Sequence, residues 1–231
     1  MIEKFIQIIF NKSDFKLSDD IPLSYVVQTG FGYIIGLIRG GIRRFGFATV
    51  GSRLVLGCGV KFRVKSKISI GDRVRIGSKT FIDALSIEGV HLENGVKIGE
   101  NSKILVTGTL SDLGKGLWIG QNTSFSENSF FGAAGGIRIG EDVIAGQNVR
   151  FHAENHNYSD LGIPIRLQGI NRKGIEIGNN VWIGAGAVFL DGAKVGNNSI
   201  IAANAVVQKE FPDNSIVGGV PAKLIRKLDV L

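Results

Sequence analysis

Cysteine is almost missing from this chain of 231 residues, because Cys58 is its single representative. One thiol excludes an intramolecular disulfide framework and a cysteine-rich zinc site, and a reducing, cytoplasmic setting is the simplest interpretation. Proline is scarce as well, with four residues. Since 44% of the residues are hydrophobic, the composition is not that of a disordered low-complexity chain.

Signals for nucleic-acid binding and for secretion are also lacking. No run of Lys and Arg is interleaved with aromatic residues, so nothing indicates a nucleic-acid partner. The first ten residues are mostly apolar, but no small-residue cleavage site follows them, so no cleavable signal peptide is expected. The formal charge of +7 fits attraction to anionic substrates, nucleotides or membrane surfaces and does not choose among them.

The apolar segment Tyr25–Ile38 has 14 residues and is shorter than the roughly 20 that span a bilayer. Together with a short amphipathic helix over Met1–Phe10, it predicts an N-terminal helical segment over residues 1–48. This segment either lies at a membrane surface, peripheral to the cytoplasmic face, or packs on the protein or a partner subunit, and the sequence leaves both open. Three cations follow the apolar segment directly: Arg39, Arg43 and Arg44.

Glycine, in contrast, is abundant, with 33 residues, and it recurs directly after aliphatic residues. An apolar residue returns every six positions in the longest unbroken series, which comprises Ile177, Ile183, Phe189, Val195, Ile201 and Val207. Neither the period of a strand nor that of a helix explains a repeat of six, whereas the coils of a parallel β-helix do. We therefore predict a mostly β solenoid over residues 49–212, in which three hexads complete each coil.

The spacing of the repeat locates the insertions between coils. We expect coils to start at Val50, Ile70, Ile98, Ile119, Ile139, Ile177 and Val195. The interval from Ile70 to Ile98 then contains ten extra residues, and the interval from Ile139 to Ile177 contains twenty. The second insertion is a loop over residues 154–174, beside His156, and loops on a rigid scaffold often carry function.

The repeat fades after Val207. Residues 213–231 are expected to form a C-terminal cap with a short helix over Pro221–Leu228, because proline is favoured in the first helical turn.

Three sequence blocks resemble a known family, the hexapeptide-repeat acyltransferases with a left-handed parallel β-helix. They are Ile177-Gly-Asn-Asn-Val-Trp-Ile-Gly184, Ile201-Ala-Ala-Asn-Ala-Val-Val-Gln-Lys209 and Val217-Gly-Gly-Val-Pro-Ala-Lys-Leu-Ile-Arg226. The segment Glu154-Asn-His-Asn-Tyr-Ser-Asp160 is similar to the branch of bacterial surface-polysaccharide O-acetyltransferases. The resemblance covers about residues 50–227.

This resemblance implies a homotrimer with acetyl-CoA in a groove between subunits and a loop histidine as general base. It places Trp182 beside the acetyl-CoA arm, the Ala185 N–H at the thioester oxygen and the Ala203 backbone on the pantetheine amides. Ala185 stands where many relatives have Ser, and Gln208 stands where they have Thr, so both positions depart from the family pattern. Further contacts to the acetyl-CoA are expected from Gln208, Lys209, Lys223 and Arg226.

Histidine suits the role of base because its unperturbed pKa lies near neutrality. Of the three histidines, His156 lies at the end of the coil that starts at Ile139, the position at which the family keeps its base. His152 follows the inward-facing Phe151 and is expected to point outward near the groove as an auxiliary residue, whereas His91 is expected to have no role there. Glu154 and Asp160 are the carboxylates that could orient the base, and the sequence does not choose between them.

Acceptor contacts are harder to predict. Asn128 lies on the preceding coil near the expected acceptor pocket, although a turn-forming asparagine explains it equally well. Four polar loop residues could hold an acidic or phosphorylated acceptor, and loop solubility explains them nearly as well: Arg166, Gln168, Arg172 and Lys173.

Acetyl transfer from acetyl-CoA to a sugar hydroxyl of a capsular, exopolysaccharide or O-antigen precursor is the function that these residues favour. One alternative is N-acetylation of a nucleotide-linked amino sugar, and another is a non-catalytic β-helix that binds a partner. The γ-type carbonic anhydrases share the fold, but the spacing of His152 and His156 is one residue too short for their zinc ligands. No metal is therefore expected.

Overall fold

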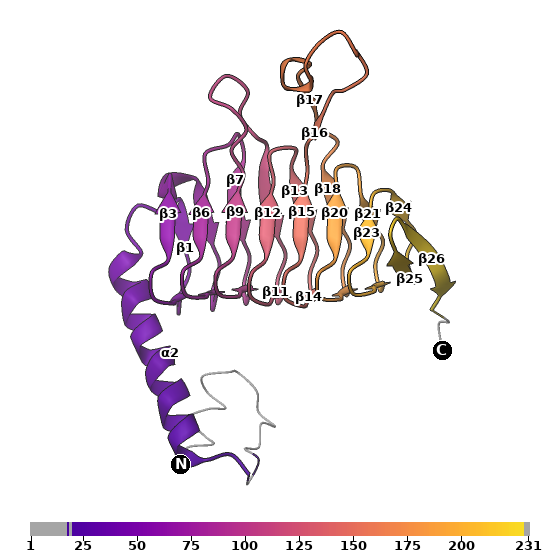
Figure 1. The fold of residues 1–231 in the computed structure, drawn as a ribbon. Helices are drawn as coiled ribbons and strands as arrows, with labels where there is room; N and C mark the ends of the chain where they lie inside the picture. The colour runs from indigo at the N-terminus through magenta and orange to yellow at the C-terminus, as the bar shows by residue number, and fades with distance from the viewer. Residues whose placement is uncertain (1–17, 19, 229–231) are drawn as a thin grey trace. The chain divides into compact units, whose positions relative to one another are not determined.

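Three parallel sheets wind around a common core in the computed structural model, which describes residues 18 and 20–228 (Figure 1). The chain divides into two compact units, residues 1–35 and 36–231, and the sheets all lie in the second. The chain passes from a strand of sheet A to one of sheet B and one of sheet C, and then returns to sheet A. The prediction of a left-handed parallel β-helix is confirmed.

The strands are short, as expected for flat solenoid faces. Sheet A contains β1 (Thr49–Val50), β4 (Ile68–Ile70), β7 (Gly89–Leu92), β10 (Gly116–Ile119), β13 (Ile137–Ile139), β18 (Ile175–Ile177), β21 (Lys194–Val195) and β24 (Glu210–Phe211). Sheet B contains β2 (Val55–Leu56), β5 (Arg75–Ile76), β8 (Lys97–Ile98), β11 (Ser124–Phe125), β14 (Ile144–Ala145), β19 (Trp182–Ile183), β22 (Ile200–Ile201), β25 (Ser215–Gly219) and β26 (Ala222–Lys227). Sheet C contains β3 (Lys61–Arg63), β6 (Phe81–Asp83), β9 (Lys103–Leu105), β12 (Phe130–Gly132), β15 (Arg150–His152), β20 (Val188–Leu190) and β23 (Val206–Val207).

The register corrects one predicted coil start. In sheet A, Ile70 pairs with Leu92, and Leu92 pairs with Ile119. Ile98 belongs to sheet B, where it pairs with Ile76 and Phe125. The error arose because Leu92 is followed by Glu93 and so lacks the glycine that marks the other coil starts.

With Leu92 as the coil start, the predicted ten-residue insertion becomes two smaller ones, before and after this residue. Paired positions lie 22 residues apart along the sequence in the first of these coils and 27 residues apart in the second. Where no loop intervenes, they lie 18 residues apart. The excesses are therefore four and nine, and the larger one is the loop 107–115 between β9 and β10. It leaves the solenoid where the chain passes from sheet C to sheet A, which we call the C–A edge. The loop 154–174 leaves the solenoid along the same edge (Figure 1).

The glycines of the repeat allow successive coils to approach each other. A Cβ atom at Gly184 would lie 2.4 Å from the nitrogen of Ala203 in the next coil, closer than atoms can approach. Many turns place other residues in the left-handed conformation. Among residues 18 and 20–228, 13 non-glycine residues have positive φ, and eight of them are Asn. Asparagine tolerates this conformation because its short polar side chain bonds locally.

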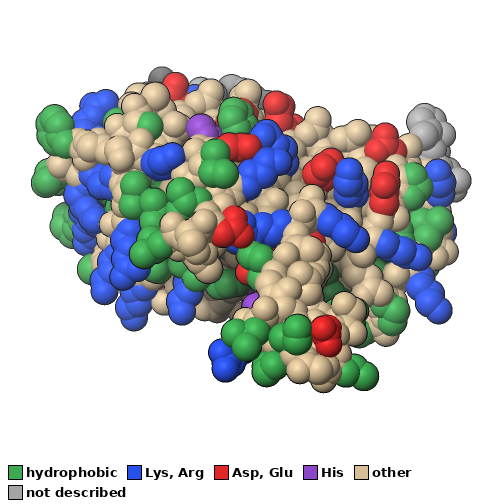
Figure 2. All heavy atoms as spheres, turned by 90° about the horizontal axis from the view of Figure 1, so that it is seen from above, with side chains coloured by type: hydrophobic (Ala, Val, Ile, Leu, Met, Phe, Trp, Pro, Cys, Tyr) green, Lys and Arg blue, Asp and Glu red, His purple; other side chains and the backbone are tan. Residues whose placement is uncertain are grey.

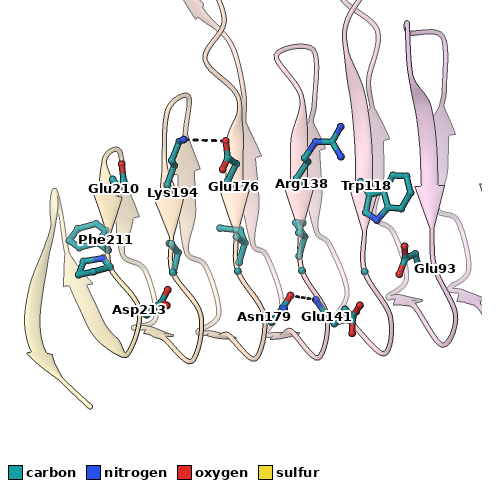
Figure 3. A pocket seen from close by; sticks show the side chains of 18 residues that line it. Glu93, Trp118, Arg138, Glu141, Glu176, Asn179, Lys194, Glu210, Phe211 and Asp213 are labelled. Carbon is teal, nitrogen blue, oxygen red and sulfur yellow. Dashed lines mark hydrogen bonds and ion pairs between the residues drawn. The ribbon is translucent and has the colours of Figure 1, made fainter. Parts of the chain in front are cut away.

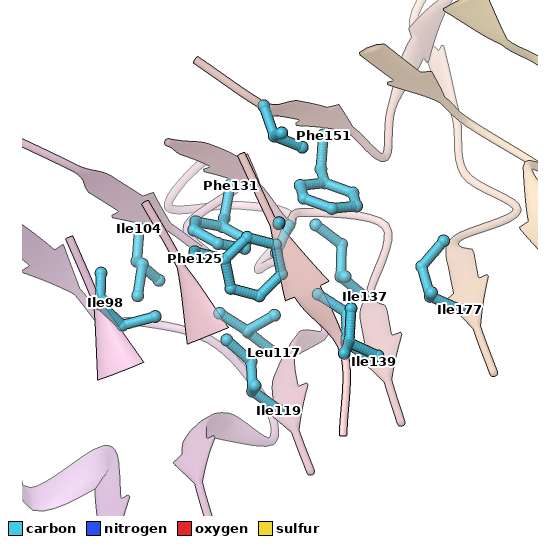
Figure 4. Close-up of a cluster of buried hydrophobic side chains, with 14 of the residues drawn as sticks. Ile98, Ile104, Leu117, Ile119, Phe125, Phe131, Ile137, Ile139, Phe151 and Ile177 are labelled. Atoms are coloured by element: carbon cyan, nitrogen blue, oxygen red, sulfur yellow. The ribbon is translucent and has the colours of Figure 1, made fainter. Parts of the chain in front are cut away.

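Aromatic side chains fill the middle of the core (Figure 4). Phe151 of sheet C stacks on Phe131 at 5.2 Å and on Phe189 at 4.7 Å, measured between ring centroids. Phe125 of sheet B meets the rings of Phe131 and Phe151 edge-on. These four side chains are at most 3% exposed, so the fifth coil, which precedes the loop 154–174, is anchored by a rigid aromatic stack.

Helix α2 (Leu23–Arg43) includes the apolar segment that the sequence indicated. From Gly36 onward it packs on the first coil, since a Cβ at Gly40 would lie 1.9 Å from the carbonyl oxygen of Leu54. Arg43 donates to the Val60 carbonyl at 2.6 Å, so this arginine caps the open end of the solenoid. Within the described residues, no helix combines the length and apolar character that crossing a membrane requires. The amphipathic helix predicted over Met1–Phe10 lies outside the described residues.

The C-terminal cap is a strand, and the predicted helix over Pro221–Leu228 is wrong. Strand β26 pairs antiparallel with β25, and the coil pattern continues past Val207 through β24 and β25. The last coil leaves the backbone groups of sheet B unpaired, and a hairpin that returns along this edge satisfies them. A helix could not, because its own hydrogen bonds are internal.

Candidate active site

His156 lies on a short hairpin at the base of the loop 154–174. Strand β16 (Asn155–His156) pairs antiparallel with β17 (Ile170–Asn171), and His156 lies opposite Ile170. The histidine side chain is exposed, and its imidazole makes no hydrogen bond within residues 18 and 20–228. Both ring nitrogens are therefore accessible to a substrate hydroxyl.

Arg172 ties the two insertions of the C–A edge together. Its Nε donates to the Glu154 carboxylate at 2.8 Å, and its guanidinium contacts the Asp112 carboxylate at 3.1 Å. A further bond reaches the carbonyl of Leu113 at 3.3 Å. We call the two chain segments at the base of the loop 154–174, residues 154–156 and 170–174, its neck. Because the arginine side chain is only 16% exposed, these contacts fix the loop 107–115 against this neck.

Asp191 closes the neck from the following coil. Its carboxylate accepts hydrogen bonds from the backbone N–H groups of Lys173 and Gly174, both at 2.8 Å, and from the Asn155 side chain at 3.4 Å. The residue is 7% exposed, and three donors satisfy a carboxylate that would otherwise be costly to bury. Asp191 thus holds both strands of the neck, one of which carries His156.

The distal part of the loop is ordered by its own side chains. The Gln168 amide donates to the carbonyls of Asp160 and Ile163, both at 2.7 Å, and accepts from the Asp160 N–H. Asn157 donates to the Gln168 carbonyl at 3.0 Å and accepts from Asn171 at 2.9 Å. The loop is a compact hydrogen-bonded unit that contains a short 3₁₀ turn, η2 (Ile165–Leu167).

Neither Glu154 nor Asp160 forms a hydrogen bond with His156 within the protomer. Glu154 binds Arg172, and one oxygen of Asp160 accepts the N–H of Gly162 at 2.8 Å. Both bonds are local structure of the loop. The residues that position the loop are instead Arg172, which the sequence indicated only as a possible acceptor contact, and Asp191, which it did not indicate.

The predicted backbone donors lie on another edge, where the chain passes from sheet B to sheet C, which we call the B–C edge. Ala185 and Ala203 occupy the same position in the turns of successive coils, and their N–H groups make no hydrogen bond within the described part of the chain. Asn128 lies at the same edge with φ 60°, in one of the left-handed turns. This conformation fits the turn-forming interpretation, and a contact of Asn128 with the acceptor stays a prediction.

Sheet B carries three more of the residues expected to contact acetyl-CoA. The Trp182 side chain points outward from β19 and is 55% exposed, between Ile144 and Ile200 of the neighbouring strands. Lys223 and Arg226 lie on β26, and both are exposed. These side chains and the N–H groups of the B–C edge therefore form one group.

A second group lies along the C–A edge. His156 and Arg166 belong to the loop there, and Gln208 and Lys209 follow β23 two coils further on. His152 points outward at the end of β15 in sheet C, where its ring lies 5.3 Å from that of Phe130. The width of sheet C separates the two groups. A sheet C strand of three residues with one flanking residue on each side spans roughly 17 Å. A single protomer therefore does not bring the proposed base, His156, to Ala185, whose N–H is expected to meet the thioester oxygen.

The charged face of sheet A is a different surface. A shallow hollow of about 510 Å³ runs along it, bordered by Trp118, Arg138 and Glu176 (Figure 3). None of the predicted site residues lines this hollow. His91 stacks on Trp118 at 4.8 Å and contacts the Glu88 carbonyl at 2.9 Å, so it has a structural role. Within the described residues, no three histidine, cysteine or acidic side chains gather as a metal ion would require.

The sequence contained a signal for Asp191 that was missed. Lys173, the residue it holds, lies 18 residues earlier, which is one coil length. A residue one coil after the end of a loop faces the returning chain, so an acidic residue there can accept its N–H groups. No such periodic signal predicts Arg172 as the link between the insertions, because Asp112 lies 60 residues away along the chain.

The chain is similar to known families and proteins. The family described as "Bacterial transferase hexapeptide (six repeats)" matches residues 174–209, and "Hexapeptide repeat of succinyl-transferase" matches residues 67–104. The galactoside O-acetyltransferase of Escherichia coli is 32% identical over 144 residues, which is 56% of this chain and 70% of that protein.

Two further proteins complete the comparison. The "Putative lipopolysaccharide biosynthesis O-acetyl transferase WbbJ" of E. coli is 27% identical over 58% of this chain and 73% of its own. The matched regions span 44 to 73% of the length of the curated relatives. The N-acyltransferase AntD of Bacillus cereus, solved with coenzyme A and a dTDP-linked amino sugar, superposes with a TM-score of 0.56. It is 17% identical, with 83% of this chain and 90% of that one covered, which shows a shared fold.

Proposed function

Because the chain belongs to the hexapeptide-repeat acetyltransferases, we propose that it transfers the acetyl group of acetyl-CoA to a sugar hydroxyl. The observation that carries the proposal is the ordered hairpin that holds His156 exposed on the C–A edge. We further propose that the acceptor is a precursor of a surface polysaccharide. The support for this acceptor is the similarity to WbbJ, which is named as a putative O-acetyl transferase of lipopolysaccharide biosynthesis, together with the loop sequence around His156.

In the proposed reaction, the His156 imidazole takes the proton of the acceptor hydroxyl while the hydroxyl oxygen attacks the carbonyl carbon of the thioester. The Ala185 N–H, which has no partner within the described residues, donates to the oxyanion of the tetrahedral intermediate. Collapse breaks the carbon–sulfur bond and forms the ester. The coenzyme A thiolate leaves and receives the proton from the imidazolium, so the enzyme returns to its starting state.

The two groups of site residues require two protomers, and we propose a homotrimer in which the C–A edge of one protomer, at the loop 154–174, meets the B–C edge of the next, so that the first coils stay outside this contact. Sheet C presents half-buried apolar side chains outward, among them Phe81, Phe130 and Val188. The loop tip exposes further apolar side chains, with Leu161 99% exposed. Both surfaces are of the kind that a closed, symmetric interface would bury.

Acetyl-CoA would be held by the group on sheet B and the B–C edge, with Trp182 beside the pantetheine arm and the Ala203 backbone on its amides. We propose that Lys223 and Arg226 of this group meet its phosphates, together with Lys209 from the C–A edge of the neighbouring protomer. Arg166 and His152 are assigned to the acceptor side, because both lie near the loop that carries His156.

The mechanism is tested by replacing His156 with Ala. Turnover should fall by about 10²–10⁴ while the affinity for acetyl-CoA changes little, because the imidazole acts on the acceptor proton. Coenzyme A thiol release would be measured with a panel of nitrophenyl glycosides, and acetyl-CoA binding by calorimetry. His91→Asn, on the opposite sheet A, is the matched control and should keep its turnover. Near-normal activity of the His156 variant would refute the assignment.

The acceptor is tested on the cell's own glycans. Mass spectrometry of surface polysaccharides, with and without this protein, should show an acetyl-sized mass difference that mild base removes, because an ester is base-labile. A base-stable difference would instead identify an amide and therefore N-acetylation of an amino sugar, the reaction class of the AntD neighbour.

A further inference from the structure

The positive charge of this chain is concentrated at one end of the solenoid. Residues 36–103 contain 13 Lys and Arg against five Asp and Glu, a net charge of +8. Residues 104–231 contain eleven of each, so their net charge is zero. The cations gather over the first coils, at the left of the space-filling view (Figure 2). The excess is therefore not a general property of the surface.

Exposed apolar side chains lie among these cations. We define the first-coil patch as Phe45, Val64 and Ile87 with Arg44, Arg63, Lys65 and Lys67. Phe45 is 79% exposed, Ile87 67% and Val64 39%.

The members of the first-coil patch are joined by contacts. The Lys65 ammonium donates to the carbonyls of Arg43 and Phe45, and the Lys67 ammonium donates to the carbonyl of Ile87 at 3.0 Å. The cations therefore lie directly beside the apolar side chains. Next to the patch, the last turns of α2 expose two more large apolar side chains, Ile38 at 55% and Ile42 at 70%.

The acidic side chains near the first-coil patch do not cancel its charge. Asp83 pairs with Arg63 at 3.3 Å, and Glu88 reaches away to Arg138 at 3.1 Å. Helix α2 itself contains no acidic residue. Beyond the Arg63–Asp83 pair, the patch keeps an excess of cations in Arg44, Lys65 and Lys67. A surface that combines apolar side chains with excess cations fits the boundary of an anionic bilayer, where the apolar groups enter the acyl region and the cations meet phosphates.

We propose that the first-coil patch docks this protein on an anionic lipid bilayer. A free polyanion, such as a nucleic acid or an acidic glycan, would account for the cations but not for the exposure of Phe45, Ile87 and Ile42. A bilayer accounts for both features. The affinity for it should rise with the fraction of anionic lipid and fall with salt, because the charge contribution is screened within about 10 Å at 0.1 M.

Docking through this patch would place the candidate active site near the lipid surface. Val64 and Ile87 lie on the C–A edge, along which the loop carrying His156 leaves the solenoid (Figure 1). From the first coil to the fifth the spacing is roughly 19 Å, at about 4.8 Å per coil. A lipid-linked acceptor anchored in the same bilayer could therefore reach the loop. The docking itself does not depend on the proposed function.

The test is co-sedimentation of the full chain with vesicles of phosphatidylcholine alone, or of phosphatidylcholine and phosphatidylglycerol in a two-to-one ratio. We expect at least tenfold stronger partition to the anionic vesicles and a loss of at least tenfold in 0.5 M NaCl. The pair Arg44→Gln and Arg63→Gln should lower partition by about fivefold for each charge removed. Phe45→Ser with Ile87→Ser should lower it further at high salt, where only the apolar contribution remains.

Two exposed residues outside the patch provide matched controls. Leu110, which is 87% exposed on the loop 107–115, is replaced by Ser, and Lys194, which pairs with Glu176 on sheet A, by Gln. Both controls should partition like the wild type, and circular dichroism melting should confirm that every variant is folded. Equal binding to both kinds of vesicle, equal losses in the control variants, or binding to heparin without binding to vesicles would each overturn the proposal.

Discussion

The charge state of His152 is set by its immediate surroundings on sheet C. Partial burial lowers the pKa of this imidazole, and the neighbouring Arg150 lowers it further. The ring packs beside Phe130, which contributes to its removal from water. His152 therefore favours its neutral form and presents an uncharged ring next to the loop of His156.

This lowered pKa predicts how stability depends on pH. In the unfolded chain His152 takes up a proton near its ordinary value of about 6.5, whereas the folded protein resists it. Stability should therefore be unaffected by this group above that pH and should fall as the pH decreases from 6.5 toward the lower folded pKa. Chemical unfolding at several pH values between 5 and 8 would measure this change in the free energy of unfolding.

His152→Gln is the control for this pH dependence. The variant should lose part of the decrease below pH 6.5, because glutamine does not titrate. His91→Asn should retain the decrease. An identical pH profile in wild type and the His152 variant would contradict the assignment.

At the scale of elements, the loop 154–174 is distinguished by how its neck is held. Arg172 and Asp191 fasten it from two sides, one to the loop 107–115 and the other to the following coil. Long loops without such contacts are usually mobile and would leave the position of His156 undefined. Order in this loop is therefore a property of a few polar side chains and not of the solenoid itself.

Replacement of Arg172 by Met should release the loop. Removing the arginine leaves the Glu154 carboxylate, which is 29% exposed, without its partner, at a cost of about 1 kcal/mol, whereas the Asp112 carboxylate is 59% exposed and remains in water. We expect faster proteolysis within residues 158–167 and a lower kcat, with little change in KM for acetyl-CoA, which binds at the other edge. Limited proteolysis and steady-state kinetics would measure these effects.

The matched control is Arg138→Met, which breaks the Arg138–Glu88 ion pair on sheet A. These two side chains are 59% and 43% exposed, so the pair should contribute at most about 1 kcal/mol. If both variants were equally sensitive to protease, the proposed function of Arg172 as a link between the loops would be wrong.

For the whole molecule, the proposed site exists only where two protomers meet. His156 lies on the C–A edge and Ala185 on the B–C edge, and sheet C separates them. One protomer could supply the base while its neighbour supplies the N–H donor. Two variants that are inactive for different reasons should then restore activity when they share a trimer.

This complementation can be measured with His156→Ala and Ala185→Pro. Proline should fit the turn, because Gly186 after it has φ +73° and position 185 precedes it as in a type II turn, but it removes the N–H. Co-expressed in equal amounts, the two variants should give about a quarter of wild-type turnover, since a random closed trimer pairs them correctly in that fraction of interfaces. Separately purified variants, mixed without exchange, should remain inactive. No recovery on co-expression would show that each site is built within one protomer.

Local sequence predicted most of the solenoid but misplaced particular elements. The hexad pattern identified the inward residues of nearly every coil, but the missing glycine after Leu92 shifted one coil start to Ile98. At the C-terminus, Pro221 favoured a helix by its local preference, whereas the open edge of sheet B turned the segment into β26. A propensity cannot include the hydrogen bonds that a distant strand leaves unsatisfied.

Taken alone, the sequence determined the coils, because each hexad buries one aliphatic side chain and places glycine where the next coil must approach. It also determined that the loop beside His156 is exceptional, since a repeat of fixed length makes any insertion countable. Only the tertiary structure decided what holds this loop, because Asp112 and Arg172 meet across 60 residues of chain. The tertiary structure also showed that the candidate site residues lie on two different edges. The edge on which a turn lies depends on how all preceding coils are stacked.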